Sequence, residues 1–164
     1  MKLGTLRRGR TTEELSGVVG VARLDRRTKN LTKRLNPGDV AVIDHVDLDR
    51  VSADALVSCG VSAVVNASPS ISGRYPNLGP GILMQAGIPL LDSVGKEVFA
   101  GLREGTKVRV DGDTVYAGTN TIATGEKQTE SSVAAAMTEA KAGLSTQLEA
   151  FAANTMEYMK RERA

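Results

Sequence analysis

The C-terminal segment 129–163 limits the fold more than any other part of the chain. It contains no proline and a single glycine, Gly143. Apolar and small residues recur along it every three or four positions, which is typical of one face of an α-helix and close to the heptad repeat of a coiled coil. We call these positions the helix stripe. They are Val133, Met137, Ala140, Leu144, Leu148, Phe151, Thr155 and Met159.

The length of this predicted helix has a consequence for the fold. At 1.5 Å per residue, some 33 helical residues extend roughly 50 Å, which is farther than a small domain reaches from its centre. Part of the helix is therefore expected to project from the rest of the chain, and the projecting stripe needs a cover. Three alternatives can cover the stripe. The helix can fold back across the sheet of the same chain, it can pair with a second copy of the chain, or it can bind another protein. We expect a homodimer through this helix, because the alanines at 134–136 and 152–153 permit close helix packing.

Upstream of the helix, short apolar runs alternate with short helical patterns. The run Val40–Ile43 is continuously apolar and is typical of a strand buried on both faces. Gly60 and Gly87 lie where helices end, and Asp111–Asp113 is a hairpin signal. The predicted strands are 17–24, 40–43, 61–65, 88–91, 107–110 and 114–116, and the predicted helices are 28–35, 52–59, 82–86 and 94–102.

These patterns predict an α/β fold with a mixed, mostly parallel sheet, followed by a long C-terminal α-helix. We divide the chain into a flexible basic leader (1–16), an α/β domain (17–125) and the long helix (126–164), which serves dimerisation or partner binding. The chain has 164 residues, of which 41% are hydrophobic and 24% charged, as is ordinary for a globular protein.

Charge is divided unevenly along the chain. Residues 1–35 contain ten basic and three acidic residues, although the net charge of the whole chain is only +2. A basic leader can contact anionic lipid, nucleic acid or an acidic partner, or it can be a solvated arm. We expect no nucleic-acid partner, because the leader has no binding motif and no interleaved aromatic residues, whereas a peripheral membrane contact stays open.

The inventory of reactive side chains argues against an enzyme. Cys59 is the only cysteine, so the chain can form no internal disulfide, and His45 is the only histidine. Asp47 and Asp49 follow His45 and favour helix capping over weak cation binding. We therefore expect no catalytic residues, no metal site and no cofactor. No secretory signal or membrane-spanning run is found, so we expect a cytoplasmic protein.

The loop 66–80 is long and rich in Ser, Gly and Pro. It follows a predicted strand and opens a helix, so its amides, its hydroxyls and the Arg74 guanidinium are candidates for binding a phosphorylated or nucleotide-like molecule. No phosphate-binding fingerprint occurs in it, and its side chains can instead satisfy its own backbone. The candidate ligand-binding residues are Ser68, Ser70, Ser72, Gly73, Arg74, Tyr75, Asn77 and Gly79.

Five segments of the sequence resemble the SteA family of bacterial cytokinetic-ring proteins. These segments are 36–44, 47–56, 63–68, 72–80 and 148–155, and 72–80 (SGRYPNLGP) is the most distinctive. Family members continue into a domain similar to the catalytic fold of thiamine pyrophosphokinase, which this sequence lacks. The resemblance implies a non-catalytic scaffold in cell division, at the septum near the inner face of the membrane. It also implies a membrane-bound SteB-like partner and control of peptidoglycan cleavage as daughter cells separate.

A second similarity covers residues 38–116. The order of strands, helices and glycine-rich loop is similar to the small swivelling β/β/α domain of enzymes that use phosphoenolpyruvate. That domain carries a phosphohistidine at the helix after the loop, where this chain reads Asn77–Gly81 without histidine. The resemblance therefore implies the fold and not the phosphotransfer chemistry.

Overall fold

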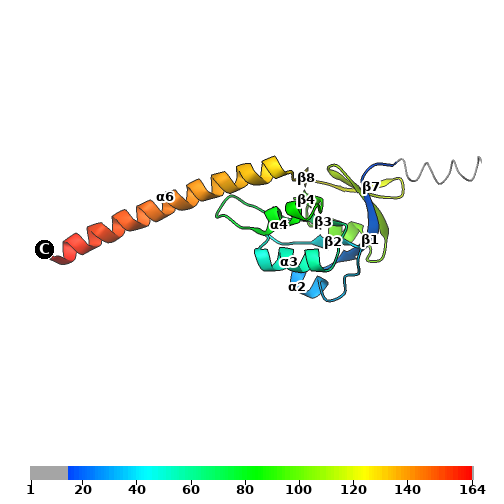
Figure 1. Ribbon diagram of the computed structural model, residues 1–164, viewed down its shortest axis with the longest axis horizontal. Helices are drawn as coiled ribbons and strands as arrows, with labels where there is room; N and C mark the ends of the chain where they lie inside the picture. Colours follow the sequence, from blue (N-terminus) through cyan, green and yellow to red (C-terminus); the bar gives the residue numbers. More distant parts are fainter. Residues whose placement is uncertain (1–14, 164) are drawn as a thin grey trace, which may run out of the picture.

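A computed structural model describes residues 15–163. The chain forms a mixed α/β fold with one eight-stranded sheet and a long C-terminal helix (Figure 1). The sheet order is β7-β6-β5-β1-β2-β3-β4-β8. The strands are β1 (Val18–Leu24), β2 (Val40–Ile43), β3 (Ala63–Asn66), β4 (Leu90–Asp92), β5 (Lys107–Asp111), β6 (Thr114–Ala117), β7 (Asn120–Thr124) and β8 (Glu126–Lys127).

The sheet is parallel at its centre and antiparallel toward both edges. Strands β1 to β4 run parallel, β5 to β7 continue antiparallel beyond β1, and β8 pairs antiparallel with β4. Only Gly125 separates β7 at one edge from β8 at the other, so the sheet curls until its edges meet. A side chain at Gly125 would overlap the carbonyl oxygen of Asp92, so this approach requires glycine.

Two apolar cores lie on the two faces of the curled sheet. The inner core contains Val42, Val65 and Val108 and is closed by α5 (Val98–Gly101). The outer core contains Ile43 and Val64 and is covered by three helices. These helices are α2 (Thr28–Leu31), α3 (Arg50–Ser58) and α4 (Gly79–Gln85). Both faces of β2 and β3 are buried, which explains their continuous apolar runs.

The predicted class, with a mixed sheet and a long C-terminal helix, is confirmed. The predicted strand 40–43 matches β2, and Gly60 has the left-handed backbone expected after α3. Several boundaries differ from the prediction. The helices predicted at 28–35 and 94–102 are shorter in the structure, and β7 and β8 were not predicted.

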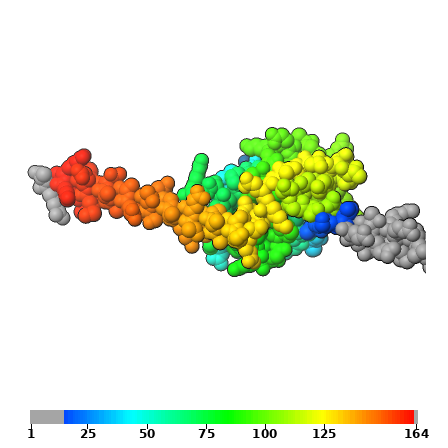
Figure 2. Space-filling view, turned by 90° about the horizontal axis from the view of Figure 1, so that it is seen from above, coloured from blue at the N-terminus to red at the C-terminus, as the bar shows by residue number. Residues whose placement is uncertain are grey.

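The long helix α6 spans Glu130–Arg163, 34 residues, and projects from the domain. It begins at Glu130 rather than at residue 126, because Glu126–Lys127 pairs with β4 as β8. In Figure 2 the second half of α6 extends away from the domain as a single rod. The leader predicted at 1–16 lies outside the described residues except for its last two, Leu15 and Ser16.

Candidate functional site

The base of α6 is tied to the sheet by a short chain of hydrogen bonds. Gln128 donates through Nε2 to Asp92 Oδ2 at 3.0 Å, and Ser132 donates through Oγ to Gln128 Oε1 at 2.7 Å. The Ser132 amide donates to Thr129 Oγ1 at 3.1 Å, and the Thr129 amide donates to Ser132 Oγ at 2.8 Å. This reciprocal pair satisfies amides that a helix start leaves free, so the direction of the helix is set where it leaves the domain.

The first half of the helix stripe is covered by the domain. Val133 and Ala140 are buried, and Met137 and Leu144 are partly buried. Helix α4 is the main neighbour of this part of α6. The first half of the stripe therefore packs against the domain as part of its hydrophobic core.

The second half of the helix stripe is exposed. We call Ser145–Glu162 the free helix segment, since each of its residues is exposed to solvent. Leu148 is 59% exposed, Phe151 is 69% exposed and Met159 is 51% exposed, and the polar Thr155 lies between them. Large apolar side chains gathered on one projecting face are typical of an interaction site.

Two exposed residues beside the stripe were not predicted. Met156 is 63% exposed and Tyr158 is 62% exposed, and helical geometry places them on the two flanks of the stripe. The repeat of three and four residues selected Thr155 and Met159 and left these two outside. Together they widen the apolar face of the free helix segment.

Three serines at alternate positions of the loop 66–80 donate to three aspartates. Ser68 donates to Asp44. Ser70 donates to Asp92 at 2.6 Å. Ser72 donates to Asp47 at 2.8 Å. The hydroxyls that an anion site would require therefore already bind carboxylates, which repel anions.

The buried Asp92 carboxylate is the centre of this arrangement. Burial raises the pKa of Asp92, and the hydrogen bonds from Ser70 and Gln128 oppose that shift without cancelling it. The same carboxylate thus binds the loop and the base of α6. Asp92 lines none of the four main pockets of residues 15–163, and both of its carboxylate oxygens accept hydrogen bonds, so we assign it a structural role.

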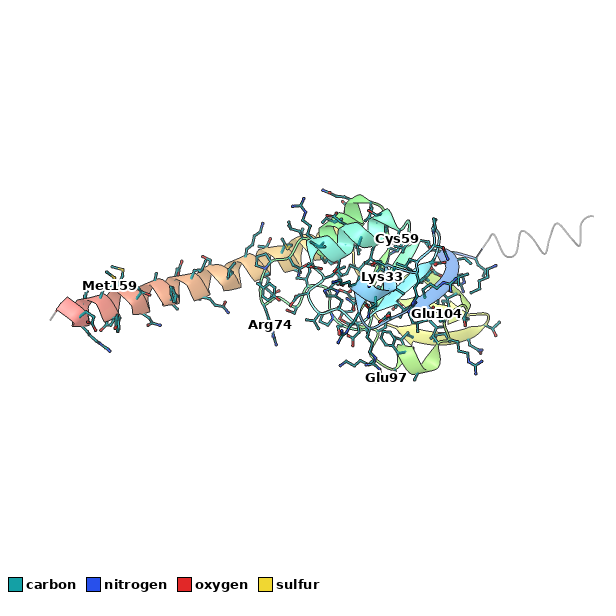
Figure 3. The ribbon with its side chains drawn as sticks, turned by 90° about the horizontal axis from the view of Figure 1, so that it is seen from below. Lys33, Cys59, Arg74, Glu97, Glu104 and Met159 are labelled. Atoms are coloured by element: carbon teal, nitrogen blue, oxygen red, sulfur yellow. The ribbon has the colours of Figure 1, made fainter. Side chains whose placement is uncertain are left out.

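The other candidate loop residues are divided between packing and the surface. Asn77 donates to the Ser70 carbonyl oxygen at 3.2 Å. Gly79 is buried where α4 begins, and a side chain there would overlap the carbonyl oxygen of Leu48. Arg74 and Tyr75 are exposed, and Figure 3 places Arg74 at the end of the domain from which α6 projects.

The loop also approaches the long helix. A side chain at Gly143 would meet the carbonyl oxygen of Gly73 at 3.9 Å, so the loop and α6 lie side by side at this level. The free helix segment starts two residues later. The loop therefore closes the end of the domain where the helix becomes free.

The cluster around His45 is a capping arrangement. Asp49 accepts a hydrogen bond from the Ser52 amide at 3.2 Å and is the N-cap of α3, as predicted for one of the two aspartates. Burial acts to raise the pKa of Asp49. The hydrogen bonds from Ser52 and the electrostatic effect of the nearby His45 outweigh burial, so the pKa is lowered below its ordinary value. His45 Nδ1 lies 2.8 Å from Thr28 Oγ1. Within residues 15–163, no group of three or more His, Cys, Asp or Glu side chains is arranged to hold a metal ion.

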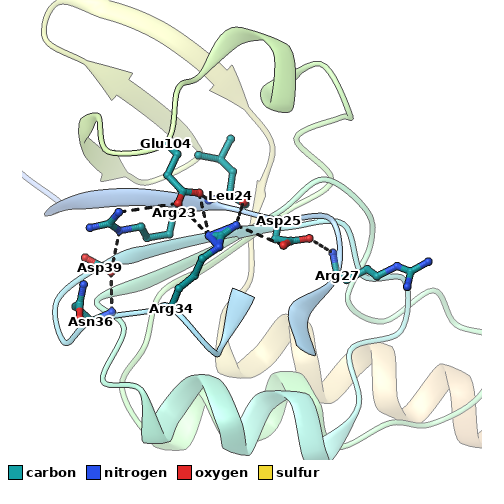
Figure 4. Close-up of polar contacts among 8 residues, drawn as sticks. All are labelled: Arg23, Leu24, Asp25, Arg27, Arg34, Asn36, Asp39 and Glu104. Carbon is teal, nitrogen blue, oxygen red and sulfur yellow. Dashed lines mark hydrogen bonds and ion pairs between the residues drawn. The ribbon is translucent and has the colours of Figure 1, made fainter. Parts of the chain in front are cut away.

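A charged cluster around the C-terminal end of β1 was not predicted (Figure 4). Glu104 accepts from Arg34 at 3.0 Å and lies 3.9 Å from Arg23. Arg23 also donates to the buried Asp39 at 3.3 Å. Glu104 and Arg34 are 70 residues apart in the chain, so no local sequence pattern reveals their contact. The cluster joins β1 to the segments before β2 and β5 and has a structural role.

No protein-family model matches the chain, and no curated protein matches it significantly. Among residues 15–163, no helix combines the length and the apolar character needed to cross a membrane.

Proposed function

We propose that this chain is a non-catalytic scaffold whose α/β domain presents the free helix segment for association with a second copy. The observation that carries the proposal is the exposure of Leu148, Phe151 and Met159 on one face of a helix that no other described residue covers. The first half of the same stripe is packed against the domain. The exposed half therefore continues a face that already serves for packing.

The energy of burial supports association through this face. Burying a large apolar side chain contributes about 1.5–3 kcal/mol. Two copies bring six such side chains from Leu148, Phe151 and Met159, which together contribute about 9–18 kcal/mol when fully buried. This contribution is large enough to offset the cost of association, which is about 4–15 kcal/mol. The alanines at 152 and 153 let the helix backbones approach closely.

The polar side chains of the domain support a scaffold rather than an enzyme. The serines of the loop 66–80 bind carboxylates, and His45 is held between Thr28 and Asp49. A nucleophile requires a base within hydrogen-bond reach, and none of these serines lies against the histidine. The alternative function is ligand sensing by the loop 66–80. We do not favour it, because the loop hydroxyls that would bind a phosphorylated ligand already donate to aspartates.

The setting of this scaffold is proposed from the sequence resemblance to the SteA family. In that setting the chain acts at the division septum, at the inner face of the membrane, with a SteB-like membrane-bound partner. There it controls peptidoglycan cleavage during daughter-cell separation. Self-association through the free helix segment would give this assembly two copies of the domain.

Self-association is tested by light scattering after size exclusion. We expect the chain to have the mass of two copies, and the double variant Leu148→Asp/Phe151→Asp to have the mass of one. The matched control is Ala150→Asp/Ala153→Asp, which adds the same charge on the opposite face of the helix and should leave the dimer intact. Circular dichroism checks that both variants keep their helix. A parent chain that is monomeric at all concentrations, or a dimer that survives the stripe substitutions, would refute the proposal.

A further inference from the structure

We propose that a phosphate group binds in a pocket at the carboxyl ends of β1 and β2. The pocket is lined by residues 26–29, by residues 44–46 and by Ser52, and its volume is about 320 Å³. We call it the basic pocket. Residues 26–29 follow β1 and residues 44–46 follow β2, which runs parallel to it. Proteins of the α/β class often bind ligands beyond these ends of their parallel strands. The inference concerns the domain and is independent of the proposed self-association through α6.

Three cations that line the basic pocket form no ion pair within residues 15–163. They are Arg26, Arg27 and Lys29, and all three are exposed. Figure 4 shows the contrast with a paired arginine, because the Arg34 guanidinium lies against Glu104 whereas that of Arg27 turns away from it. Guanidinium and ammonium groups are the side-chain donors that proteins use to bind phosphate. The basic pocket therefore offers donors that no carboxylate of the described chain occupies.

The carboxylate that lines the basic pocket is already balanced by other groups. Asp44 is the one acidic residue among those that line it. Its carboxylate accepts a hydrogen bond from the Ser68 hydroxyl and lies 3.9 Å from Lys96 Nζ. Three further basic residues thus face one carboxylate that has a cation of its own, so the pocket carries an excess of positive charge. Such an excess attracts anions, unlike the loop 66–80 with its three bound aspartates.

The two sides of the basic pocket are held together before any ligand arrives. The Asp44 amide donates to the Arg26 carbonyl oxygen at 3.3 Å. Thr28 Oγ1 and His45 Nδ1 lie 2.8 Å apart and join the segment after β1 to the segment after β2. The Arg26 guanidinium lies over the Phe99 ring, 5.1 Å from its centre, which restricts where this side chain points. A site held in this way loses less conformational entropy when it binds.

Phosphate binding is tested on the full chain with inorganic pyrophosphate, followed by the amide shifts in nuclear magnetic resonance spectra. We expect saturable shifts at the residues that line the basic pocket. The pocket variant Arg27→Gln/Lys29→Gln should weaken binding by about tenfold or more, since two charged donors are lost. The matched control is Lys33→Gln/Arg103→Gln, which removes the same charge from exposed residues outside the pocket. It should keep the affinity of the parent within about twofold.

A second variant should change the affinity in the opposite direction. Asp44→Asn removes the negative charge that lines the basic pocket, and its amide oxygen can still accept from Ser68. We expect pyrophosphate to bind about two- to tenfold more tightly, because a like charge no longer opposes it. Damage to the fold would weaken binding, so a gain in affinity cannot arise from unfolding. An unchanged or lower affinity in an Asp44→Asn chain with the circular dichroism of the parent would overturn the inference.

The phosphate group can belong to a soluble molecule or to a lipid headgroup, and vesicles distinguish the two sources. Sedimentation with phosphatidylglycerol–phosphatidylcholine vesicles is compared with sedimentation with phosphatidylcholine alone. Pyrophosphate binding that the pocket variant weakens indicates a soluble source. Sedimentation with the anionic vesicles that only the pocket variant loses, without pyrophosphate binding, indicates a headgroup. Both results support the basic pocket. Equal binding by the pocket variant and the control, or binding to neither probe, overturns it and leaves the proposed self-association standing.

Discussion

Ser70 donates its hydroxyl to the Asp92 carboxylate over 2.6 Å, and the two residues are 0% and 1% exposed. The Ser70 amide donates to the other oxygen of the same carboxylate at 3.0 Å. Gln128, just before α6, donates to it as well. One buried aspartate at the end of β4 therefore holds both the loop after β3 and the base of the projecting helix.

Removing the Ser70 hydroxyl should destabilise the domain. Ser70→Ala leaves the buried Asp92 carboxylate with one donor fewer, and an unsatisfied buried polar group costs about 1–3 kcal/mol. We expect a loss of that size in the free energy of unfolding, measured by urea denaturation. The matched control is Ser72→Ala, since Ser72 makes the equivalent bond to Asp47 but is exposed to water. Equal losses in both variants would show that burial of the Ser70–Asp92 pair adds nothing.

The raised pKa of Asp92 predicts a pH dependence of stability. Because burial raises the pKa from its ordinary value of 3.8, the folded chain binds the Asp92 proton more tightly than the unfolded chain. Stability from this group is therefore lost as the pH rises from about 4 through the folded pKa. The free energy of unfolding of the parent chain, minus that of Asp92→Asn, should fall over this window in urea titrations at successive pH values. A difference that increases with pH would mean that the folded pKa is lowered instead.

Two glycines of α4 should respond oppositely to alanine. A side chain at Gly79 would overlap the carbonyl oxygen of Leu48, so Gly79→Ala must displace α4 from the loop before α3. We expect a loss of about 1–3 kcal/mol, as for other overpacked sites. Gly81 is in the same helix, and a methyl group placed there would have no neighbour within 4 Å. Gly81→Ala should therefore be neutral or stabilise by up to about 1 kcal/mol. Thermal unfolding of both variants measures the contrast, and equal effects would contradict it.

Local patterns were sufficient for the centre of the fold. The apolar run Val40–Ile43 predicted β2 with its observed bounds, because a strand buried on both faces admits little else. The aspartates after His45 predicted a helix cap, and Asp49 is that cap. Strands β7 and β8 were not predicted because they are short and largely exposed, so they have no strong apolar pattern. Strand β8 is defined by its pairing with β4, which is distant in the chain.

The candidate site was predicted in part. The repeat in 129–163 identified the face of α6, and the helix length implied that part of it projects. Which residues project depended on where the domain ends against the helix, at Gly143. The hydroxyls of the loop 66–80 made it a candidate for ligand binding. Their hydrogen-bond partners Asp44, Asp47 and Asp92 lie 22 to 25 residues away in the chain, so no local pattern reveals that these hydroxyls are already bound.

The α/β class, the parallel strands and the long helix with its stripe could be predicted from local patterns, because they follow from hydrophobic periodicity and turn residues over short stretches. The curl of the sheet, which brings β7 and β8 together across Gly125, became visible only in the folded chain. The same is true of the stripe, which is covered at Ala140 and exposed at Phe151. These features arise from contacts between distant segments, whose geometry no local pattern encodes.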